Sequence, residues 1–391
     1  MIEREIKDKL TEIAREYPVI LIQGPRQSGK TTLCKMLFTD KPYVSMETPD
    51  VRERAENDPI GFLSNYPNGA ILDEIQKVPA ILSYIQGIVD QVNVPNMFIL
   101  TGSNNLLLMQ AVSQSLSGRV AIFNLLPFSM KEAEKLYSSD NASERILYGG
   151  YPRLLSNKMS VGPFFENYIS TYVEKDVREV LKIKDAALFR KFVVLCANRI
   201  GNILDITGLA KDCGVSTKTV YEWLSILETS FICFQLQPYF VNKTKRLVKS
   251  PKLYFYDTGL ACALLGIRDT EQLRKDKAYG ALFENSVVLE YIKRNFNELK
   301  SEKMYYYRTS DGIEVDLVIE RGRKIQPVEI KSTKTFQTTW TKGIEKFNSE
   351  YSDSVSGLVL YDGTDSMSYK DIAVKPFCSL WSNFQNSLHK S

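Results

Sequence analysis

The chain has 391 residues, of which 44% are hydrophobic and 25% are charged, and its formal net charge is +4. This balance is typical of a globular protein of two or three domains and argues against disorder. No apolar run approaches the roughly 18 residues of a membrane helix, and the N-terminal stretch is too charged for a secretory signal. We therefore expect a cytoplasmic protein without a membrane partner.

The counts of single residue types exclude several kinds of catalysis. His389 is the only histidine and lies in a polar tail, so a Ser-His-Asp triad or a histidine zinc site has almost nothing to be built from. The six cysteines are far apart and form no CxxC pair, which argues against a zinc knuckle or a disulfide framework. Any catalysis must therefore use carboxylates, lysine or a metal ion.

The first part of the chain alternates between helical and strand patterns. Apolar residues recur at helical spacing over residues 2–16, and apolar runs of strand length follow. These runs are Val19–Ile22, Ala70–Leu72, Met97–Leu100 and Val120–Phe123. Stretches with helical spacing separate them, which predicts an α/β domain with a parallel sheet and flanking helices.

A phosphate-binding loop directly follows the first predicted strand. The segment matches GxxxxGK[ST] and consists of Gly24, Pro25, Arg26, Gln27, Ser28, Gly29, Lys30, Thr31 and Thr32. Glycines let the backbone curl so that its N–H groups point at phosphate oxygens, and the next helix presents its positive end to them. Lys30 is expected to reach the β- and γ-phosphates, and Thr31 to bind Mg²⁺.

Polar residues follow the later strands at the places where nucleotide hydrolysis needs them. Asp73 and Glu74 end a buried strand, and we expect Asp73 to join the magnesium shell and Glu74 to orient the attacking water. After the next strand, Asn104, with Ser103 beside it, is a candidate neighbour of the γ-phosphate. Arg119 is a candidate for stabilising the transition state, in its own subunit or a neighbouring one, although a surface role is equally compatible with its position.

The segments GPRQSGKTT, AILDEIQ and FILTGSN together resemble the bacterial and archaeal AAA-type ATPases that carry a C-terminal domain of unknown function. The later segments LPFSMKEA, GGYPRLL and LYFYDTGLACALL fit the same family, so the resemblance covers most of the chain. It implies a P-loop ATPase core that uses ATP and Mg²⁺.

Residues 206–228 predict a helix-turn-helix whose second helix is capped by Ser216. Thr217, Lys218 and Tyr221 are expected to face outward, where they could enter a major groove of DNA. Residues Lys243–Lys252 then contain five basic side chains and no acid, in the place of a wing, and could contact phosphates. The alternative is a packing module with a solvated basic loop.

Residues 313–319 and 324–331 predict a hairpin around Gly322. Strand alternation places Glu314 and Asp316 on one face. The alternative for such alternating charges is the ordinary solvated face of an antiparallel sheet.

The returning strand brings Glu329 and Lys331 to the same face as Asp316. This set resembles the PD-(D/E)xK nuclease pattern, with Glu284 on the preceding helix as the usual additional acid. The carboxylates would hold Mg²⁺ against a scissile phosphate and the lysine would stabilise negative charge.

These predictions divide the chain into four parts. They are a P-loop AAA-type ATPase domain at 1–155, a helical linker region at 156–200, a winged-helix domain at 201–265 and a restriction-nuclease-like α/β domain at 266–391. The predicted function is ATP hydrolysis coupled to a half that binds nucleic acid or another partner. Two alternatives stay open: a metal-dependent DNA nuclease regulated by ATP, and a nucleotide-controlled switch whose nuclease-like domain is inactive. The oligomeric state also stays open.

Overall fold

The computed structural model describes the chain except residues 1, 103–105, 138–140, 178–184, 241–249 and 383–391. It forms two compact units. The first extends to Phe128 and includes residues 229–231 and 296–299, and the second contains the remainder. The helices and strands of the first unit are α1 (Lys7–Ile13), β1 (Val19–Gln23), α2 (Lys30–Leu37), β2 (Tyr43–Ser45), α3 (Pro49–Asn57), α4 (Pro59–Ser64), β3 (Ala70–Asp73), η1 (Ile75–Lys77), α5 (Ile81–Val92), β4 (Phe98–Gly102), α6 (Leu106–Ser115) and β5 (Val120–Asn124).

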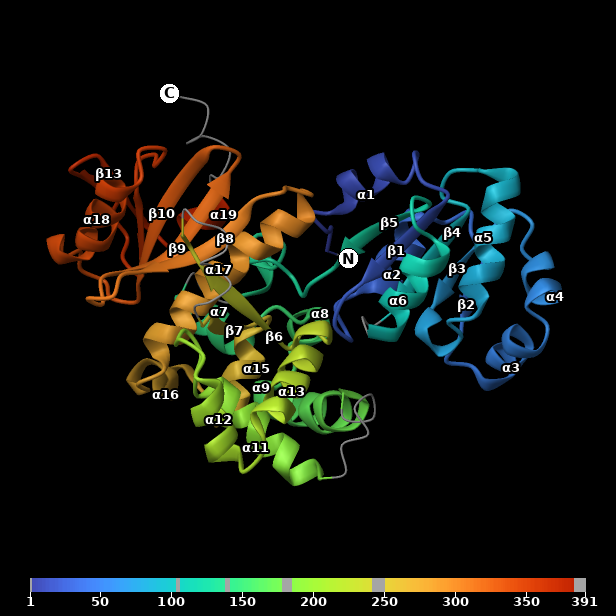
Figure 1. Cartoon of the computed structure of the whole chain (residues 1–391), viewed down its shortest axis with the longest axis horizontal. Coiled ribbons are helices and arrows are strands. Elements are labelled where there is room, and N and C mark those ends of the chain that lie inside the picture. Colours follow the sequence, from blue (N-terminus) through green and yellow to red (C-terminus); the bar gives the residue numbers. More distant parts are fainter. Residues whose placement is uncertain (1, 103–105, 138–140, 178–184, 241–249, 383–391) are drawn as a thin grey trace. The chain divides into compact units, whose positions relative to one another are not determined.

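The first unit is a parallel sheet between two layers of helices (Figure 1), with the strand order β2-β3-β4-β1-β5. Side chains alternate between the two faces of each strand, and both faces of β1, β3 and β4 are buried. Ile20 and Ile22 of β1 pack with residues of α1 and α2 on one face. Val19 and Leu21 pack with residues of α3 to α6 on the other. The apolar runs of β1, β3 and β4 are continuous because these three strands are covered on both sides.

All four predicted strands of this unit are present, and all five strands run in parallel. Their carboxyl ends therefore lie at one edge of the sheet, where ligands bind in open α/β folds. The loop after β1, the ends of β3 and β4, and the start of α2 meet at this edge.

The second unit begins with a group of helices. Its elements up to the last long helix are η2 (Glu134–Leu136), α7 (Ala142–Tyr148), α8 (Pro152–Ser156), α9 (Val161–Tyr168), the π-helix η3 (Ile169–Val177), α11 (Ala186–Ala197), α12 (Ile206–Cys213), α13 (Thr217–Thr229), β6 (Cys233–Pro238), β7 (Lys252–Phe255), α15 (Thr258–Leu264), α16 (Thr270–Lys275) and α17 (Tyr279–Asn297). Asp257, in the segment 253–265, links it to the segment 149–155, because its carboxylate accepts hydrogen bonds from the backbone N–H of Gly150 at 2.8 Å and of Leu260 at 2.9 Å. Residues 149–155 therefore belong to the second unit, and the predicted ATPase limit at residue 155 lies beyond the end of the first. The four domain limits remain predictions.

An eight-stranded mixed sheet forms the rest of the second unit, in the order β12-β13-β11-β10-β9-β8-β6-β7. Its further elements are β8 (Lys303–Arg308), β9 (Glu314–Arg321), β10 (Lys324–Lys331), η4 (Thr338–Thr341), α18 (Lys342–Glu350), β11 (Leu358–Tyr361), β12 (Met367–Tyr369), β13 (Ile372–Pro376) and α19 (Ser379–Ser382). The predicted hairpin is β9–β10, in which Arg321 pairs with Lys324 across a two-residue turn. Gly322 in that turn has φ of +61°, a conformation that glycine adopts without strain.

Candidate functional site

The loop between β1 and α2 has the backbone of a phosphate-binding loop. Gly24 and Gly29 have φ of +156° and +95°, and Gln27 has φ of +63°. A Cβ atom on Gly24 would lie 2.2 Å from the backbone oxygen of Leu125, so this position admits only glycine. Such left-handed residues let consecutive backbone amides line a concave anion site.

Lys30 lies across this loop. Its Nζ donates hydrogen bonds to the backbone oxygens of Gly24 and Pro25, both at 2.9 Å. Burial lowers the pKa of Lys30, while the nearby Glu74 and Asp73 oppose that shift. The Oγ of Ser28 is buried and has no hydrogen-bond partner among the described residues. The loop therefore offers a buried cation and an unsatisfied hydroxyl, which fit a phosphate chain.

The other residues of the predicted loop surround this core. Pro25 is buried, Arg26 is half-buried with Nη2 3.8 Å from Glu47 Oε1, and Thr32 is exposed in the first turn of α2.

Arg4 contacts the phosphate loop through its backbone, a role that its position in the sequence does not predict. Its Nη1 donates to the backbone oxygen of Ser28 at 2.8 Å and its Nη2 to that of Leu126 at 2.7 Å. Its guanidinium also stands 5.0 Å from the ring centre of Phe128. Because Arg4 is only 6% exposed, this is an internal brace between the phosphate loop and the chain that follows β5.

Asp73 lies at the end of β3 and gathers three hydroxyl donors. Thr31 Oγ1 is 3.1 Å from both carboxylate oxygens, and Tyr43 OH donates to Oδ2 at 2.6 Å. Thr101, at the end of β4, donates to Oδ1. Burial and the hydrogen bond to Asp73 raise the pKa of Tyr43 to about 12. Thr31 and Asp73 come together as predicted, whereas sequence reasoning missed Tyr43 and Thr101.

Glu74 directly follows and has φ of +57°. A left-handed conformation is uncommon for a glutamate and carries strain of about 1–3 kcal/mol, a feature often found at functional sites. Its Oε2 accepts a hydrogen bond from the Nε2 of Gln76. Glu74 is therefore held at the same edge of the sheet as Asp73.

Three further predicted residues have different outcomes. Asn104 and Ser103 lie outside the described residues. Arg119 immediately precedes β5, whose first residue pairs with Val19 at the start of β1. The phosphate loop follows the other end of β1, so Arg119 is at the opposite edge of the sheet. It pairs with Asp90, with Nη2 3.0 Å from Oδ2, and its assignment as a catalytic residue stays a prediction.

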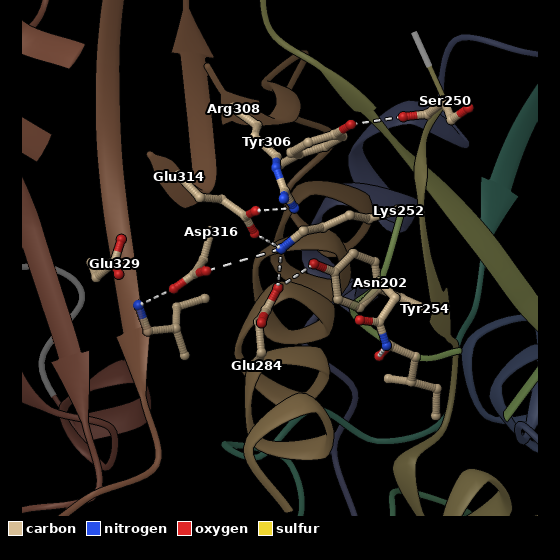
Figure 2. Close-up of polar contacts among 12 residues, drawn as sticks. Asn202, Ser250, Lys252, Tyr254, Glu284, Tyr306, Arg308, Glu314, Asp316 and Glu329 are labelled. Carbon is tan, nitrogen blue, oxygen red and sulfur yellow. Dashed lines mark hydrogen bonds and ion pairs between the residues drawn. The ribbon is translucent and has the colours of Figure 1, made fainter. Parts of the chain in front are cut away.

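The predicted carboxylate hairpin brings its acids together in the second unit, and Figure 2 shows Glu314, Asp316 and Glu329 together with Glu284. Asp316 Oδ2 accepts a hydrogen bond from the backbone N–H of Ile330 at 2.8 Å and lies 3.5 Å from Lys331 Nζ. Lys331 also pairs with Glu329. Glu284 reaches the same place from α17, where Tyr254 OH donates to its Oε1.

Lys252 is the residue that sequence reasoning misplaced. It was predicted as the last residue of a basic run in the place of a wing, either contacting phosphates or solvated, but it is only 2% exposed. Its Nζ is 2.9 Å from Glu284 Oε1, contacts Glu314, and is 4.0 Å from Asp316 Oδ1. It lies in β7, where it is covered by the elements that carry these acids. The preceding residues of the run, 243–249, lie outside the described part of the chain.

The charges in this cluster are strongly coupled. Burial raises the pKa of Glu284 to about 7, and the neighbouring Asp316 adds to that shift. Burial likewise raises the pKa of Glu329 well above its usual range. Burial alone would lower the pKa of Lys252, but Glu284, Asp316 and Glu314 outweigh it and the pKa is raised. Within the described residues, no group of three or more His, Cys, Asp or Glu side chains is arranged to hold a metal ion.

The predicted helix pair is formed by α12 and α13. Gly214 between them has φ of +81°, and Ser216 Oγ accepts from the N–H of Thr219 at 3.1 Å, as the capping prediction requires. Thr217, Lys218 and Tyr221 are exposed, with Tyr221 at 61%. The face expected to point outward is therefore accessible on α13.

None of the helices in the described part of the chain is long and apolar enough to cross a membrane.

Three parts of the chain match known domain families. Residues 16–134 match an AAA domain. Residues 139–271 and 279–380 match two domains of unknown function, DUF8612 and DUF4143. Together with the parallel sheet, the AAA match identifies the first unit as a P-loop NTPase fold.

Three relatives of the chain are described as uncharacterized proteins. It is 31% identical over 337 residues to the uncharacterized protein Rv2008c of Mycobacterium tuberculosis, covering 85% of this chain and 74% of that protein. The uncharacterized protein Mb2031c of Mycobacterium bovis gives the same values. An uncharacterized protein of Haemophilus influenzae is 22% identical over 277 residues, covering 66% of this chain and 64% of the relative.

Among solved structures, the Walker-type ATPase PABY2304 of Pyrococcus abyssi has a TM-score of 0.44 and 17% identity, covering 68% of this chain and 96% of that one. AMPPCP-bound DnaA of Aquifex aeolicus has a TM-score of 0.30 and 14% identity, covering 57% and 86%.

Proposed function

The chain belongs to the same family as the mycobacterial proteins Rv2008c and Mb2031c and contains an AAA-type ATPase domain, and we propose that it hydrolyses ATP with Mg²⁺ at the edge of its parallel sheet. The observation that carries this proposal is the meeting of Thr31, from the phosphate loop, with Asp73, from β3. A hydroxyl and a carboxylate are oxygen ligands of the kind that Mg²⁺ takes beside a nucleotide.

The residues divide the chemistry between them. Lys30 donates to Gly24 and Pro25 oxygens and must exchange these bonds for phosphate oxygens when ATP enters. Thr31 and Asp73 would hold the magnesium ion, which would neutralise charge on the phosphates. Glu74 would accept a proton from, and orient, the water that attacks the γ-phosphate.

Two variants test this assignment. Lys30→Ala should abolish ATP binding because the phosphates lose their buried cation. Glu74→Gln should retain binding and reduce turnover by roughly 10²–10⁴-fold, the usual contribution of general acid–base groups. Lys9→Ala, which removes an exposed lysine of α1, serves as the control. Nucleotide affinity is measured by fluorescence titration and turnover by phosphate release. Wild-type turnover in both variants would refute the proposal.

Coupling to the C-terminal half is the second part of the proposal. The exposed face of α13, with Thr217, Lys218 and Tyr221, supports contact with DNA, since a helix of this kind fits a major groove. The mild net charge of the chain does not by itself attract nucleic acid. The binding would therefore depend on this local surface.

For the nuclease-like domain, the contacts of Asp316 favour a module that binds without cleaving. Its Oδ2 is engaged by the Ile330 N–H and lies near Lys331, and its Oδ1 faces Lys252. A catalytic carboxylate needs free oxygens for its metal. We therefore expect no Asp316-dependent nicking of supercoiled plasmid with Mg²⁺ or Mn²⁺, with or without ATP. Nicking by the wild type that disappears in Asp316→Asn would restore the nuclease alternative.

A further inference from the structure

Arg4 lies outside the phosphate-loop motif but is bound to the backbone of that loop. Its Nη1 donates to the oxygen of Ser28 at 2.8 Å and its Nη2 to the oxygen of Leu126 at 2.7 Å. We propose that Arg4 is a positioning residue of the phosphate site, which fixes the direction of a loop amide that binds the phosphates. This inference rests on the proposed ATP-binding site and adds to it a residue that needs no contact with the nucleotide.

The hydrogen bond to Ser28 acts on the next amide group. Because a peptide bond is planar and trans, the Ser28 oxygen and the N–H of Gly29 point in opposite directions. A guanidinium that holds the oxygen on one side of the loop therefore holds the N–H toward the other. Gly29 is the N-cap residue of α2, so its N–H lies at the positive end of that helix, which attracts phosphate oxygens. The charge of Arg4 also polarises the peptide group and makes its N–H a stronger donor.

The conformation of the loop needs such support from outside. Gln27 has φ of +63°, which is uncommon for a residue with a side chain. The Oγ of Ser28 is buried without a hydrogen-bond partner in the part of the chain that the structure describes, and an unsatisfied buried hydroxyl is unfavourable. Strained conformations persist only where the surrounding structure imposes them. The hydrogen bonds of Arg4 supply that constraint at Ser28.

The segment after β5 supports both ends of the loop. Leu125 donates from its backbone N–H to the oxygen of Gln23 at 2.8 Å. Its own oxygen lies so close to Gly24 that a Cβ atom there would stand 2.2 Å away. Leu126 is joined to the second half of the loop through Arg4. Arg4 thus extends to the end of the loop the support that Leu125 gives to its start.

The fold keeps the guanidinium in this place. Arg4 is 6% exposed, and its guanidinium carbon is 5.0 Å from the ring centre of Phe128. Ile6, two residues later, is buried in the same core cluster as Leu33 of α2 and Leu125. The helix that follows the loop, the segment after β5 and the backbone near Arg4 therefore share one core, and Arg4 acts on the loop from that core.

Arg4→Met tests the inference because it keeps an apolar side chain and removes both hydrogen bonds. The loop amides meet the phosphates before and during the reaction, so a misplaced amide weakens binding more than it slows chemistry. We expect KM for ATP and Kd for ADP to rise roughly tenfold, with a much smaller fall in kcat. Inorganic tripolyphosphate, which carries no base or sugar, should lose affinity by the same factor when it displaces a fluorescent ADP analogue. Arg4→Lys retains the charge and should lie between the wild type and Arg4→Met.

Lys41→Met is the matched control. It removes one positive charge and one side-chain hydrogen bond to a backbone oxygen, that of Asn68 at 2.7 Å, from the same unit. Lys41 and Asn68 precede β2 and β3, at the edge of the sheet opposite the phosphate loop, so the nucleotide affinities should keep their wild-type values. Tm is measured for every variant, because a purely structural role of Arg4 would lower Tm and leave the nucleotide affinities of the folded protein unchanged.

The outcomes separate this inference from the proposed function. Wild-type affinities for ADP and tripolyphosphate in Arg4→Met, a loss for ADP that tripolyphosphate does not share, or an equal loss in Lys41→Met would overturn the role of Arg4. If Arg4→Met does not fold, the same criteria apply to Arg4→Lys. The proposed function is contradicted by a different result, namely wild-type turnover in Lys30→Ala and Glu74→Gln.

Discussion

At the scale of single residues, Asp73 shows how the proposed ATPase site is held in place. Three hydroxyls, from Thr31, Tyr43 and Thr101, converge on its carboxylate from different elements. Hydrogen bonds to a charged group are worth more than neutral ones, about 1.5–3 kcal/mol each. The orientation of the proposed magnesium ligand therefore depends on residues outside the motif itself.

Tyr43→Phe should raise the Mg²⁺ concentration needed for half-maximal ATP turnover by roughly tenfold, since Asp73 loses one charge-assisted hydrogen bond. The pKa of Tyr43, near 12, keeps the phenol a donor throughout the working pH range. Turnover at saturating Mg²⁺ should change little. The measurement is a magnesium titration of phosphate release.

Tyr84→Phe is the matched control, because Tyr84 is 41% exposed on α5. Identical magnesium curves for Tyr43→Phe and Tyr84→Phe would show that the hydroxyl of Tyr43 does not position Asp73.

The residues that a local pattern specifies could be predicted, whereas those defined by contact between distant segments could not. GxxxxGK[ST] and the strand-terminal Asp73 identify their roles from neighbours in the sequence. Arg4 and Thr101 meet their partners only after the chain has folded. Lys252 is the instructive case: its sequence neighbours are basic, which indicates a solvated loop, but its neighbours in space are acids.

At the scale of elements, hydrophobic periodicity identified the strands that are buried on both faces. It missed β2, because a three-residue strand with one buried side chain carries too short a pattern. It also expected a helical linker region at 156–200, where the described residues form α9, a π-helix and α11. A π-helix differs from an α-helix in its hydrogen bonds rather than in its composition.

A buried carboxyl group lies at the contact between α13 and β6. Glu228, near the end of α13, is buried enough to raise its pKa to about 7, although hydrogen bonds with Gln235 of β6 oppose the shift. A carboxyl with a raised pKa keeps its proton in the folded state after the unfolded chain has released it. Between pH about 4.5 and about 7 this group therefore makes the free energy of unfolding fall as pH rises.

Glu228→Gln should remove that fall, which amounts to up to about 3 kcal/mol. Urea unfolding of the wild type and the variant at pH 5 and pH 8 measures it. Glu222→Gln, which changes an exposed carboxylate of the same helix, should keep the wild-type dependence. A Glu228→Gln protein with the full wild-type dependence would contradict this account.

At the scale of the whole molecule, the net charge of +4 limits how strongly the chain as a whole can attract DNA. So small a charge gives little long-range attraction, so the proposed affinity must come from a local surface such as the exposed face of α13.

Lys218→Glu should therefore weaken binding to a DNA duplex roughly tenfold at low salt and reduce the slope of log affinity against log salt by roughly one to two. Lys9→Glu brings the same change of net charge, from +4 to +2, on exposed α1 and should leave affinity nearly unchanged. Fluorescence anisotropy at several salt concentrations measures both. Equal losses in the two variants would point to a general charge effect instead of a surface on α13.

The continuous sheet of the second unit has a practical consequence for anyone who wishes to dissect the protein. β6 pairs with β7 on one side and, through Gln237 and Pro238, with β8 on the other. A fragment that starts after residue 265 would lack β6, so β8 would become an unpaired edge strand. Exposed edge strands can pair with other molecules and so promote aggregation. Insoluble material is thus expected from pieces cut in the middle of this sheet.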